Sequence, residues 1–535
     1  MQDYFRCLGY NDNYYYLYQF EKKQIKVMTN SEFTTAGFLS LAPEEYWMMT
    51  YPAKTGFNKQ TAANDLIRDC YRAGIYDPTK VRGRGAWLDD GRTVYHFGSH
   101  LRVNGVSTPV HQIKSQFVYP LAQSFKFSEC APMSDQDGAI LLETAKMFRW
   151  NKPASAALLL GWCALAPLCG ALRWRPHIWL TGGAGCGKST ILNEYIHHLM
   201  GGLDIFAQGN STEAGIRQEL HLDALPVVFD ETEQNNDREE SRMQNILSLI
   251  RQASTESGAV TLKGTASGES MKFLIRSMFC LSSIGVGIKH QADYERLTIL
   301  SLRKKSDDAD SAGSWETLKA RLITMKLDPS LPDRFFMRAL TMLPTTTHNI
   351  EIFVRVASKR FNSVREGDQY GTLLAGCWSM LKDSIATESE AAALIDSFDW
   401  EEYRENAEMD DSSRALQTLM ESRIKIAGCP DVSLHEIIRC AVSGTSPSGA
   451  EKLDKIMAEA ILNRHGMKTK SGLILISNRS QAVADLFRHT TYATDWRNQI
   501  LRCNGVKRHP VTERFSGTPS KCIEIPVESV DLTPF

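Results

Sequence analysis

The chain has 535 residues, of which 43% are hydrophobic and 23% charged, and its formal net charge is −1. This composition excludes wholesale disorder, and the length exceeds one hydrophobic core, so we expect about three domains. A net charge near zero confines any nucleic-acid-binding surface to a local patch. The twelve cysteines contain no C-x-x-C pair, which predicts reduced thiols rather than a zinc module. The amino terminus shows no basic-then-apolar signal, so we expect a cytoplasmic protein.

Residues 1–130 are predicted to form an α+β unit. Segments 14–20 and 24–28 flank a charged turn, which predicts a β-hairpin. The apolar spacing in 57–76 predicts a helix. Short strands are expected after this helix, at residues 85–91, 93–97 and 101–103.

Two features of this unit allow both a structural and a nucleic-acid-binding interpretation. The aromatic cluster Tyr14–Tyr18 could stack on bases or pack in the core of a small sheet, and we favour the core. The basic residues Lys80, Arg82 and Arg84 lie in one loop. Such a loop is more often a solvated turn than a DNA contact.

Residues 131–172 are predicted to be a helical linker or collar. The segment 154–172 carries no charge and is near the lower length limit for a membrane-spanning helix. It contains Gly161, Pro167 and Gly170, and a strand follows a few residues later. A helix buried beneath a sheet is therefore the favoured interpretation, and we expect no membrane partner.

The clearest motif is the glycine loop at residues 182–189, which fits the G-x-x-x-x-G-K-S/T phosphate-binding pattern. A predicted strand (177–180) precedes it and a predicted helix (191–200) follows it. Glycines let backbone N–H groups surround an anion, and the helix N-terminus adds its positive dipole end. Lys188 would reach the β- and γ-phosphates of ATP, and the Ser189 hydroxyl would bind Mg²⁺. The predicted nucleotide-binding residues are Gly182, Gly183, Ala184, Gly185, Cys186, Gly187, Lys188, Ser189 and Thr190.

A second motif supplies the acids that such a site needs. The apolar segment 226–229 predicts a buried strand that ends in Asp230 and Glu231. Asp230 would hold Mg²⁺, directly or through water. Glu231 would orient and polarise the attacking water.

A third strand is predicted at 277–283, where an apolar run ends in hydroxyls. Ser283, or its neighbour Ser282, could sense the γ-phosphate or the attacking water. Before it, residues 260–275 show the alternating pattern of a hairpin, with Lys263 and Lys272 near its tip. These lysines are candidate DNA-binding residues, and the alternative is an ordinary surface hairpin.

Arg296 directly precedes an apolar strand at 297–300. At that place a guanidinium could stabilise transition-state charge on the γ-phosphate bound by a neighbouring subunit. The alternative is a surface salt bridge with Asp293.

The rest of the chain is predicted to be mainly helical. Residues 306–314 are polar and predict a linker at the start of a helical domain, 306–430. Helices followed by a β segment in 431–535 predict a winged-helix-like C-terminal domain. Six basic residues in this domain could follow a phosphate backbone or form a solvated face: Arg488, Arg497, Arg502, Lys507, Arg508 and Arg514.

The order of these motifs resembles motifs A, B, B′ and C of superfamily 3 helicases, and is most similar to the AAA+ helicase half of phage, prophage and poxvirus-type primase–helicases. Segments 251–258, 365–369 and 373–376 look like signatures of the prophage branch. The resemblance covers about residues 140–520. It implies that 173–305 form an AAA+ P-loop ATPase core, an α/β fold with a parallel sheet and flanking helices.

The resemblance also implies how the protein works. It implies a homo-oligomer, a hexameric ring that threads a single DNA strand through a central pore and moves it with Lys263 and Lys272. ATP and Mg²⁺ would bind between subunits, with Arg296 as the arginine finger. The family usually ends motif C with Asn, whereas this chain has Ser283. Residues 1–130 show no primase pattern, so a primase partner is expected on another chain.

Two functions are therefore open. The first is an ATP-hydrolysing DNA helicase or translocase that serves the replication of a phage, prophage or other mobile element. The second is a nucleotide-switched AAA+ scaffold, such as a loader, a transposition regulator or an antiphage-defence ATPase, in which assembly is the output. The lysine-bearing hairpin favours the first.

Overall fold

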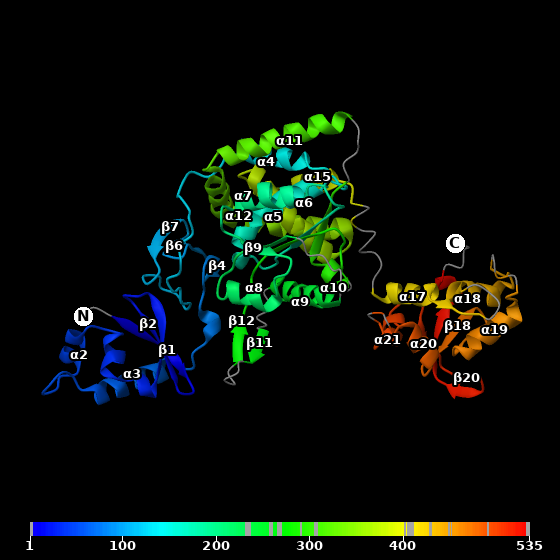
Figure 1. The fold of residues 1–535 in the computed structure, drawn as a ribbon, viewed down its shortest axis with the longest axis horizontal. Helices are drawn as coiled ribbons and strands as arrows, with labels where there is room; N and C mark the ends of the chain where they lie inside the picture. The colour runs from blue at the N-terminus through cyan, green and yellow to red at the C-terminus, as the bar shows by residue number, and fades with distance from the viewer. Residues whose placement is uncertain are drawn as a thin grey trace. The chain divides into compact units, whose positions relative to one another are not determined.

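The computed structural model describes residues 4–530 apart from 231–236, 256–260, 265–269, 289–290, 304–308, 401–402, 404–410, 427–430, 448–449, 451, 489 and 491. The chain divides into two compact units. The first comprises Met1–Gly287 and Glu295–Trp400, and the second comprises Ile288–Tyr294 and Glu401–Phe535. Figure 1 shows the helices and strands of both units.

The first unit contains a five-stranded parallel sheet with the strand order β14-β8-β13-β10-β9. Its strands are β8 (His177–Thr181), β9 (Ile205–Gln208), β10 (Val227–Asp230), β13 (Phe279–Ser283) and β14 (Leu297–Ser301). The strands β8, β13 and β10 are apolar and buried, as expected when helices cover both faces of a parallel sheet. The predicted α/β class is confirmed for this part of the chain.

Helices surround this sheet (Figure 1). They are α4 (Asp135–Lys146), α5 (Ser155–Leu165), α6 (Lys188–Thr190), α7 (His197–Met200), α8 (Glu213–Leu220), α9 (Asp237–Ala253), α11 (Ala309–Leu327), α12 (Leu331–Phe361), α13 (Val364–Glu366), α14 (Thr372–Leu381) and α15 (Glu388–Asp396). A π-helical turn, Ile191–Ile196, joins α6 to α7, and another, Gly367–Gly371, joins α13 to α14.

One predicted loop is a helix. The linker expected at 306–314 is wrong for its described part, because α11 begins at Ala309. Ala309 and Ala312 are strong helix formers, and polar composition by itself does not separate a polar helix from a loop.

The uncharged segment 154–172 is a buried helix, as favoured. Every residue of α5 is buried, and so is the 3-10 turn Ala166–Ala171 that follows it. Helix α5 packs against α14 and against the strands β8 and β14. Gly161 makes this close packing possible, because a Cβ atom there would lie 1.8 Å from the carbonyl oxygen of Leu373.

The amino-terminal part of this unit has two antiparallel sheets. The first consists of β1 (Phe5–Asn11), β2 (Tyr14–Gln19) and β3 (Gln24–Thr29), with α1 (Thr35–Leu39), α2 (Glu44–Thr50) and α3 (Lys59–Ala73). The second consists of β4 (Gly85–Asp89), β5 (Arg92–His96), β6 (His100–Val103) and β7 (Val106–Pro109). The predicted hairpin, helix and three strands are confirmed, and β7 is an additional strand.

The second of these sheets is joined firmly to the chain that leads into β10. The backbone N–H of Ala224 donates to the carbonyl of Arg84 at 2.8 Å, and Gly85 forms a parallel bridge with Ala224. The Arg84 guanidinium and backbone N–H both donate to the carboxylate of Asp223, at 2.6–2.8 Å. Residues 83–85 and 222–224 therefore form one continuous junction.

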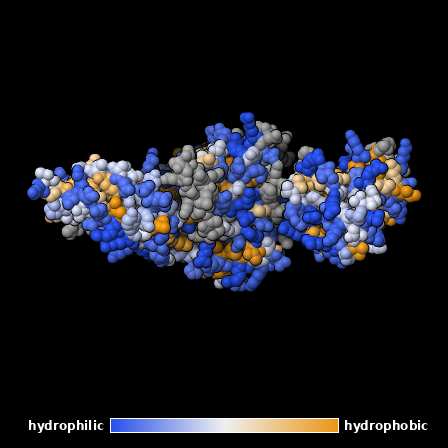
Figure 2. Space-filling view, turned by 90° about the horizontal axis from the view of Figure 1, so that it is seen from below, coloured by the Kyte–Doolittle hydropathy of each residue, from blue (hydrophilic) through white to orange (hydrophobic). Residues whose placement is uncertain are grey.

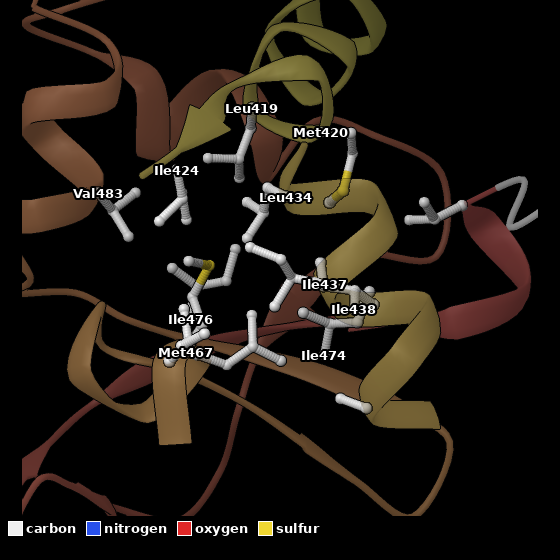
Figure 3. Packing of buried hydrophobic residues seen from close by; sticks show 14 of the residues in the cluster. Leu419, Met420, Ile424, Leu434, Ile437, Ile438, Met467, Ile474, Ile476 and Val483 are labelled. Carbon is white, nitrogen blue, oxygen red and sulfur yellow. The ribbon is translucent and has the colours of Figure 1, made fainter. Parts of the chain in front are cut away.

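The second unit contains α10 (Gln291–Tyr294), α17 (Asp411–Glu421), α18 (Leu434–Ser443), α19 (Lys455–Arg464), α20 (Gln481–Leu486) and α21 (Trp496–Ile500). Its strands are β15 (Arg423–Ile424), β16 (Val432–Ser433), β17 (Met467–Lys470), β18 (Leu473–Ser477), β19 (Lys507–Arg508), β20 (Glu513–Phe515), β21 (Thr518–Ser520) and β22 (Cys522–Pro526). Strands β17, β18, β22 and β19 form one antiparallel sheet, so this region contains more strand than its predicted, mainly helical character. Figure 3 shows how Leu434 and Ile437 of α18 pack over Met467 and Ile476 of the sheet.

The face in Figure 2 is mostly polar, and its hydrophobic residues form small separate patches. Among the described residues, no helix is both long enough and apolar enough to cross a membrane.

Candidate nucleotide-binding site

The glycine loop (residues 182–189) connects the carboxyl end of β8 to α6, as predicted. Gly185 and Gly187 have φ angles of +75° and +97°, and a Cβ atom at either would meet nothing within 4 Å. Glycine is therefore needed at these positions for the left-handed backbone and not for lack of space. The loop precedes a helix N-terminus at the carboxyl edge of a parallel sheet, where such sheets bind phosphates.

Lys188 lies over this loop. Its Nζ donates to the carbonyl oxygens of Gly182, at 2.6 Å, and Gly183, at 3.2 Å. Phosphate oxygens placed over the loop would be better acceptors for this ammonium, because a hydrogen bond between two charged groups is stronger than one to a neutral carbonyl. The Ser189 side chain is exposed in the first helical turn beside it.

A pocket of about 430 Å³ adjoins the loop, which is within the usual size for a small-ligand site. Besides Gly185–Thr190, it is lined by Met147, Phe148, Arg149, Arg303, Trp315 and Leu318. The backbone N–H of Arg303 donates to the carbonyl of Arg149 at 2.8 Å, which ties two of these segments together. The aromatic and basic lining residues were not predicted, because no motif marks them and they lie far from the loop in sequence.

Asp230 ends β10 at the same edge of the sheet. Its Oδ1 atom is buried and has no hydrogen-bond partner within the described part of the chain. A buried carboxylate oxygen without a partner is costly unless a ligand satisfies it. Magnesium prefers such oxygen ligands, so Asp230 and the Ser189 hydroxyl fit the predicted metal site. Glu231 lies outside the described residues.

Strand β13 lies between β8 and β10, where the hydroxyl-bearing strand was expected. Ser283 pairs in register with Thr181, the last residue of β8. Its buried hydroxyl accepts from the Trp179 indole at 2.7 Å and donates to the carbonyl of Gly285 at 2.5 Å. Ser283 would have to exchange this last bond to donate to a phosphate. Ser282 is buried too, and the choice between the two as sensor stays a prediction.

Arg296 lies at the opposite edge of the sheet from the glycine loop. Leu297 pairs in register with His177, the first residue of β8, whereas the loop follows the last. The five-residue strand between them spans about 16 Å, which is more than an arginine side chain can bridge. Arg296 could therefore contact a γ-phosphate only on another subunit, and both its role and the alternative salt bridge with Asp293 stay predictions.

The predicted lysine-bearing hairpin exists. Strands β11 (Thr261–Gly264) and β12 (Ser270–Phe273) are antiparallel, with Lys263 opposite Met271 and Lys272 opposite Leu262. Figure 1 shows the hairpin extending away from α8 and α9. The tip, 265–269, lies outside the described residues.

In the amino-terminal part, the aromatic and basic residues that could have bound nucleic acid mostly make structural contacts. Tyr15 and Tyr18 are buried and Tyr16 stacks on Tyr76 with ring centroids 3.8 Å apart, so the core interpretation is confirmed for these residues, whereas Tyr14 is exposed. Arg82 is buried and donates to the carbonyl of Leu88 at 2.7 Å. Because Arg84 is paired with Asp223, this loop is neither a simple solvated turn nor an open DNA contact.

The predicted basic residues of the C-terminal domain are all exposed: Arg488, Arg497, Arg502, Lys507, Arg508 and Arg514. Arg488 pairs with Asp485 at 2.5 Å and Lys507 with Glu524 at 3.2 Å. These pairs are compatible with both a solvated face and a phosphate-binding one.

No family model and no curated protein sequence matches the chain. Among solved structures, it is similar to the active helicase Cch of SCCmec type IV, at 10% identity over 98% of this chain and 93% of that one, with a TM-score of 0.47. It is also similar to the apo C-terminal region of NrS-1, at 11% identity over 79% of this chain and 95% of that one, with a TM-score of 0.28. At these identities and TM-scores, neither similarity assigns a fold or a function to this chain.

Proposed function

We propose that this protein is an ATP-hydrolysing DNA helicase or translocase that acts as a ring, with an AAA+ P-loop core. One observation carries the proposal. The left-handed glycine loop with Lys188 lies at the same carboxyl edge of the parallel sheet as the acidic strand end, where Asp230 has a buried oxygen without a partner among the described residues. This combination suits the binding of a nucleoside triphosphate with a divalent cation.

In this site, the loop N–H groups and Lys188 hold the β- and γ-phosphates of ATP. Ser189 and Asp230 hold Mg²⁺, which when bound withdraws negative charge from those phosphates. Glu231 orients the attacking water and accepts its proton, so that ATP and water give ADP and phosphate.

An intersubunit site agrees with the position of Arg296. Because Arg296 cannot reach its own glycine loop across β8, it would stabilise the γ-phosphate of a neighbouring subunit. This requirement for a neighbour supports a ring, and we propose a hexamer with a single DNA strand in its pore.

The hairpin β11–β12 supports a motor over a simple switch. It extends from the body of the unit and carries Lys263 and Lys272, which would contact DNA phosphates. The order α17, β15, α18, α19, β17 and β18 in the second unit supports a winged-helix-like DNA-binding domain. Together they favour a role in replication of a phage, prophage or other mobile element, with a primase on a separate chain.

The test measures ATP hydrolysis with and without single-stranded DNA. We expect DNA to stimulate hydrolysis, and Lys188→Ala to reduce the rate about 10²–10³-fold because one preorganised cationic contact is lost. Lys59→Ala is the matched control, since its exposed ammonium donates to Thr35 in the amino-terminal part of the chain, among residues that do not line this pocket. Absence of stimulation by single- and double-stranded DNA at every length would contradict the proposal.

Glu231→Gln separates this function from the scaffold alternative. The variant should bind ATP and assemble without hydrolysing it. A helicase then loses its biological output, whereas a nucleotide-switched scaffold retains it.

A further inference from the structure

The segment Arg365–Gln369, noted above only for its likeness to a prophage signature, contacts the chain beside Arg296. This segment consists of the last two residues of α13 and the first three residues of the π-helical turn that precedes α14. A π-turn is rare and is frequently found at functional sites. Its side chains reach the amino edge of the parallel sheet, far from the glycine loop.

Gln369 is the central contact. It is 3% exposed, and its Nε2 lies 3.0 Å from the carbonyl oxygens of His177 and Arg296 and 2.9 Å from Oγ1 of Thr298. Two carbonyl oxygens can only accept hydrogen bonds, so the amide nitrogen must face them. The carbonyl of Arg296 also accepts from the backbone N–H of His177 at 3.2 Å. Two donors therefore fix the peptide group that follows Arg296.

Arg365 adds a second contact one helical turn earlier. Its Nε lies 3.8 Å from Oε2 of Glu295, the residue just before Arg296. Residues four apart lie on the same face of a helix, so Arg365 and Gln369 contact Glu295 and Arg296 from one side.

The glycine between them lets the segment approach α12. A Cβ atom on Gly367 would lie 1.9 Å from Oγ of Ser358 and 2.8 Å from its backbone nitrogen. Any larger residue would push the turn away from α12 and displace Gln369. Arg365, Gly367 and Gln369 thus all help to hold this segment against the chain at Glu295 and Arg296.

We propose that Gln369, assisted by Arg365, is the positioning residue for Arg296: it holds the backbone of Arg296 so that the guanidinium meets the nucleotide of the neighbouring subunit. This inference rests on the proposed function, because it needs Arg296 to act between subunits. Gln369 contacts the first residue of β8, a strand length away from the glycine loop, so in this proposal it acts on hydrolysis through the backbone of Arg296 and not by contact with the nucleotide.

The test uses the full-length protein and mixed assemblies. Gln369→Leu should lower kcat for ATP hydrolysis about 10²-fold, the usual cost of misplacing a reacting group, and leave the Kd for a fluorescent ADP analogue unchanged. Arg296→Ala should cost about 10³–10⁵-fold. The double variant should be no worse than Arg296→Ala, since both changes remove the same interaction.

Mixing gives the decisive measurement. Lys188→Ala subunits have a defective loop but an intact Arg296, so mixing them with Gln369→Leu subunits creates sites that combine a sound loop with a sound arginine. We expect the mixture to hydrolyse ATP faster than either variant alone. Arg365→Ala, which removes a half-exposed side chain, should show the same rescue with a smaller loss, about 10-fold, and Arg365→Lys should restore most of the rate.

The outcomes distinguish this inference from the proposed function. Rescue of Arg296→Ala without rescue of Gln369→Leu or Arg365→Ala overturns the positioning role and leaves the intersubunit site intact. Full activity of Arg296→Ala, or no rescue of any variant, overturns the intersubunit site itself. If Gln369→Leu does not fold, Arg365→Ala decides by the same measurement.

Discussion

At the carboxyl edge of the parallel sheet, Gly185 and Gly187 turn through open space, whereas at the amino edge Gly367 and Gly371 have no room for a Cβ atom. Each edge also leaves a buried polar atom without a partner in the described chain: Oδ1 of Asp230 at the carboxyl edge and Oε1 of Gln369 at the amino edge. At the amino edge, however, Nε2 of Gln369 makes three contacts that join separate segments.

His177 joins three segments at the amino edge. Its Nδ1 accepts from the backbone N–H of Phe279 at 3.0 Å, and its Nε2 donates to Oγ of Ser254 at 3.0 Å. One imidazole thus joins β8, β13 and the end of α9. The amino edge is therefore closely packed and joined by hydrogen bonds between segments, whereas the glycine loop at the carboxyl edge has free space around it.

The largest expected effect on stability comes from a substitution in the closely packed amino edge, at Gly371. A Cβ atom on Gly371 would lie 2.8 Å from the backbone N and Cα of Val354, where no side chain can move aside. We expect Gly371→Ala to lower the free energy of unfolding of the first unit by about 3 kcal/mol, measured by chemical denaturation. Gly285→Ala is the control, because its Cβ atom would meet nothing within 4 Å and its φ is not positive. Equal stability of both variants would refute the close packing.

The second prediction concerns the pH dependence of the same edge. Burial, together with the positive charges of the neighbouring Arg175 and Arg296, lowers the pKa of His177 to about 3. In the unfolded chain His177 takes up a proton below pH 6.5, whereas in the folded chain it does so only near pH 3. The stability that neutral His177 contributes to the folded state is therefore lost as the pH falls from 6.5 towards 3. We expect a loss of about 2 kcal/mol between pH 7 and pH 5, at about 1.4 kcal/mol per pH unit.

His177→Gln isolates this titration. Glutamine can accept from Phe279 and donate to Ser254, but it has no proton to take up. Denaturation of both proteins at pH 7 and pH 5 should therefore show a steeper acid loss for the natural chain. The same loss in both would show that His177 does not titrate on unfolding.

The smallest expected effect on stability is at the open edge. Gly185→Ala places a Cβ on a left-handed residue with free space around it, which costs about 1 kcal/mol. Nucleotide affinity should fall more clearly than stability, because the loop N–H groups are turned from their directions. Isothermal titration with an ATP analogue measures the change in affinity, and chemical denaturation of the same variant measures the change in stability. A loss of stability as large as that of Gly371→Ala would show that the two edges do not differ.

The open edge could be predicted from sequence because its signals are local. The glycine loop, its flanking strand and helix, and the strands ending in Asp230 and Ser283 each lie within about ten residues of chain. The hairpin at 260–275 was likewise visible from its alternation.

The closely packed amino edge could not be predicted, because its contacts join distant segments. Gln369 meets Thr298 and His177 across 71 and 192 positions of sequence, and no spacing rule links them. Phe148 and Trp315, which line the pocket beside the glycine loop, are likewise distant from that loop in sequence. Arg82 was placed in a solvated turn because its charge is typical of one, whereas its guanidinium lies over the Phe117 ring, 3.2 Å from the centroid.

The junction between Arg84 and Asp223 has a practical consequence. Asp223 lies four residues before β10, and it is bonded to both the backbone and the guanidinium of Arg84. The sheet β4–β7 is therefore bonded directly to the segment that leads into the acidic strand. A fluorophore attached to Ser107→Cys, at an exposed position of β7, should therefore report changes in the orientation of the parallel sheet when ATP is added, rather than the independent motion of a tethered part.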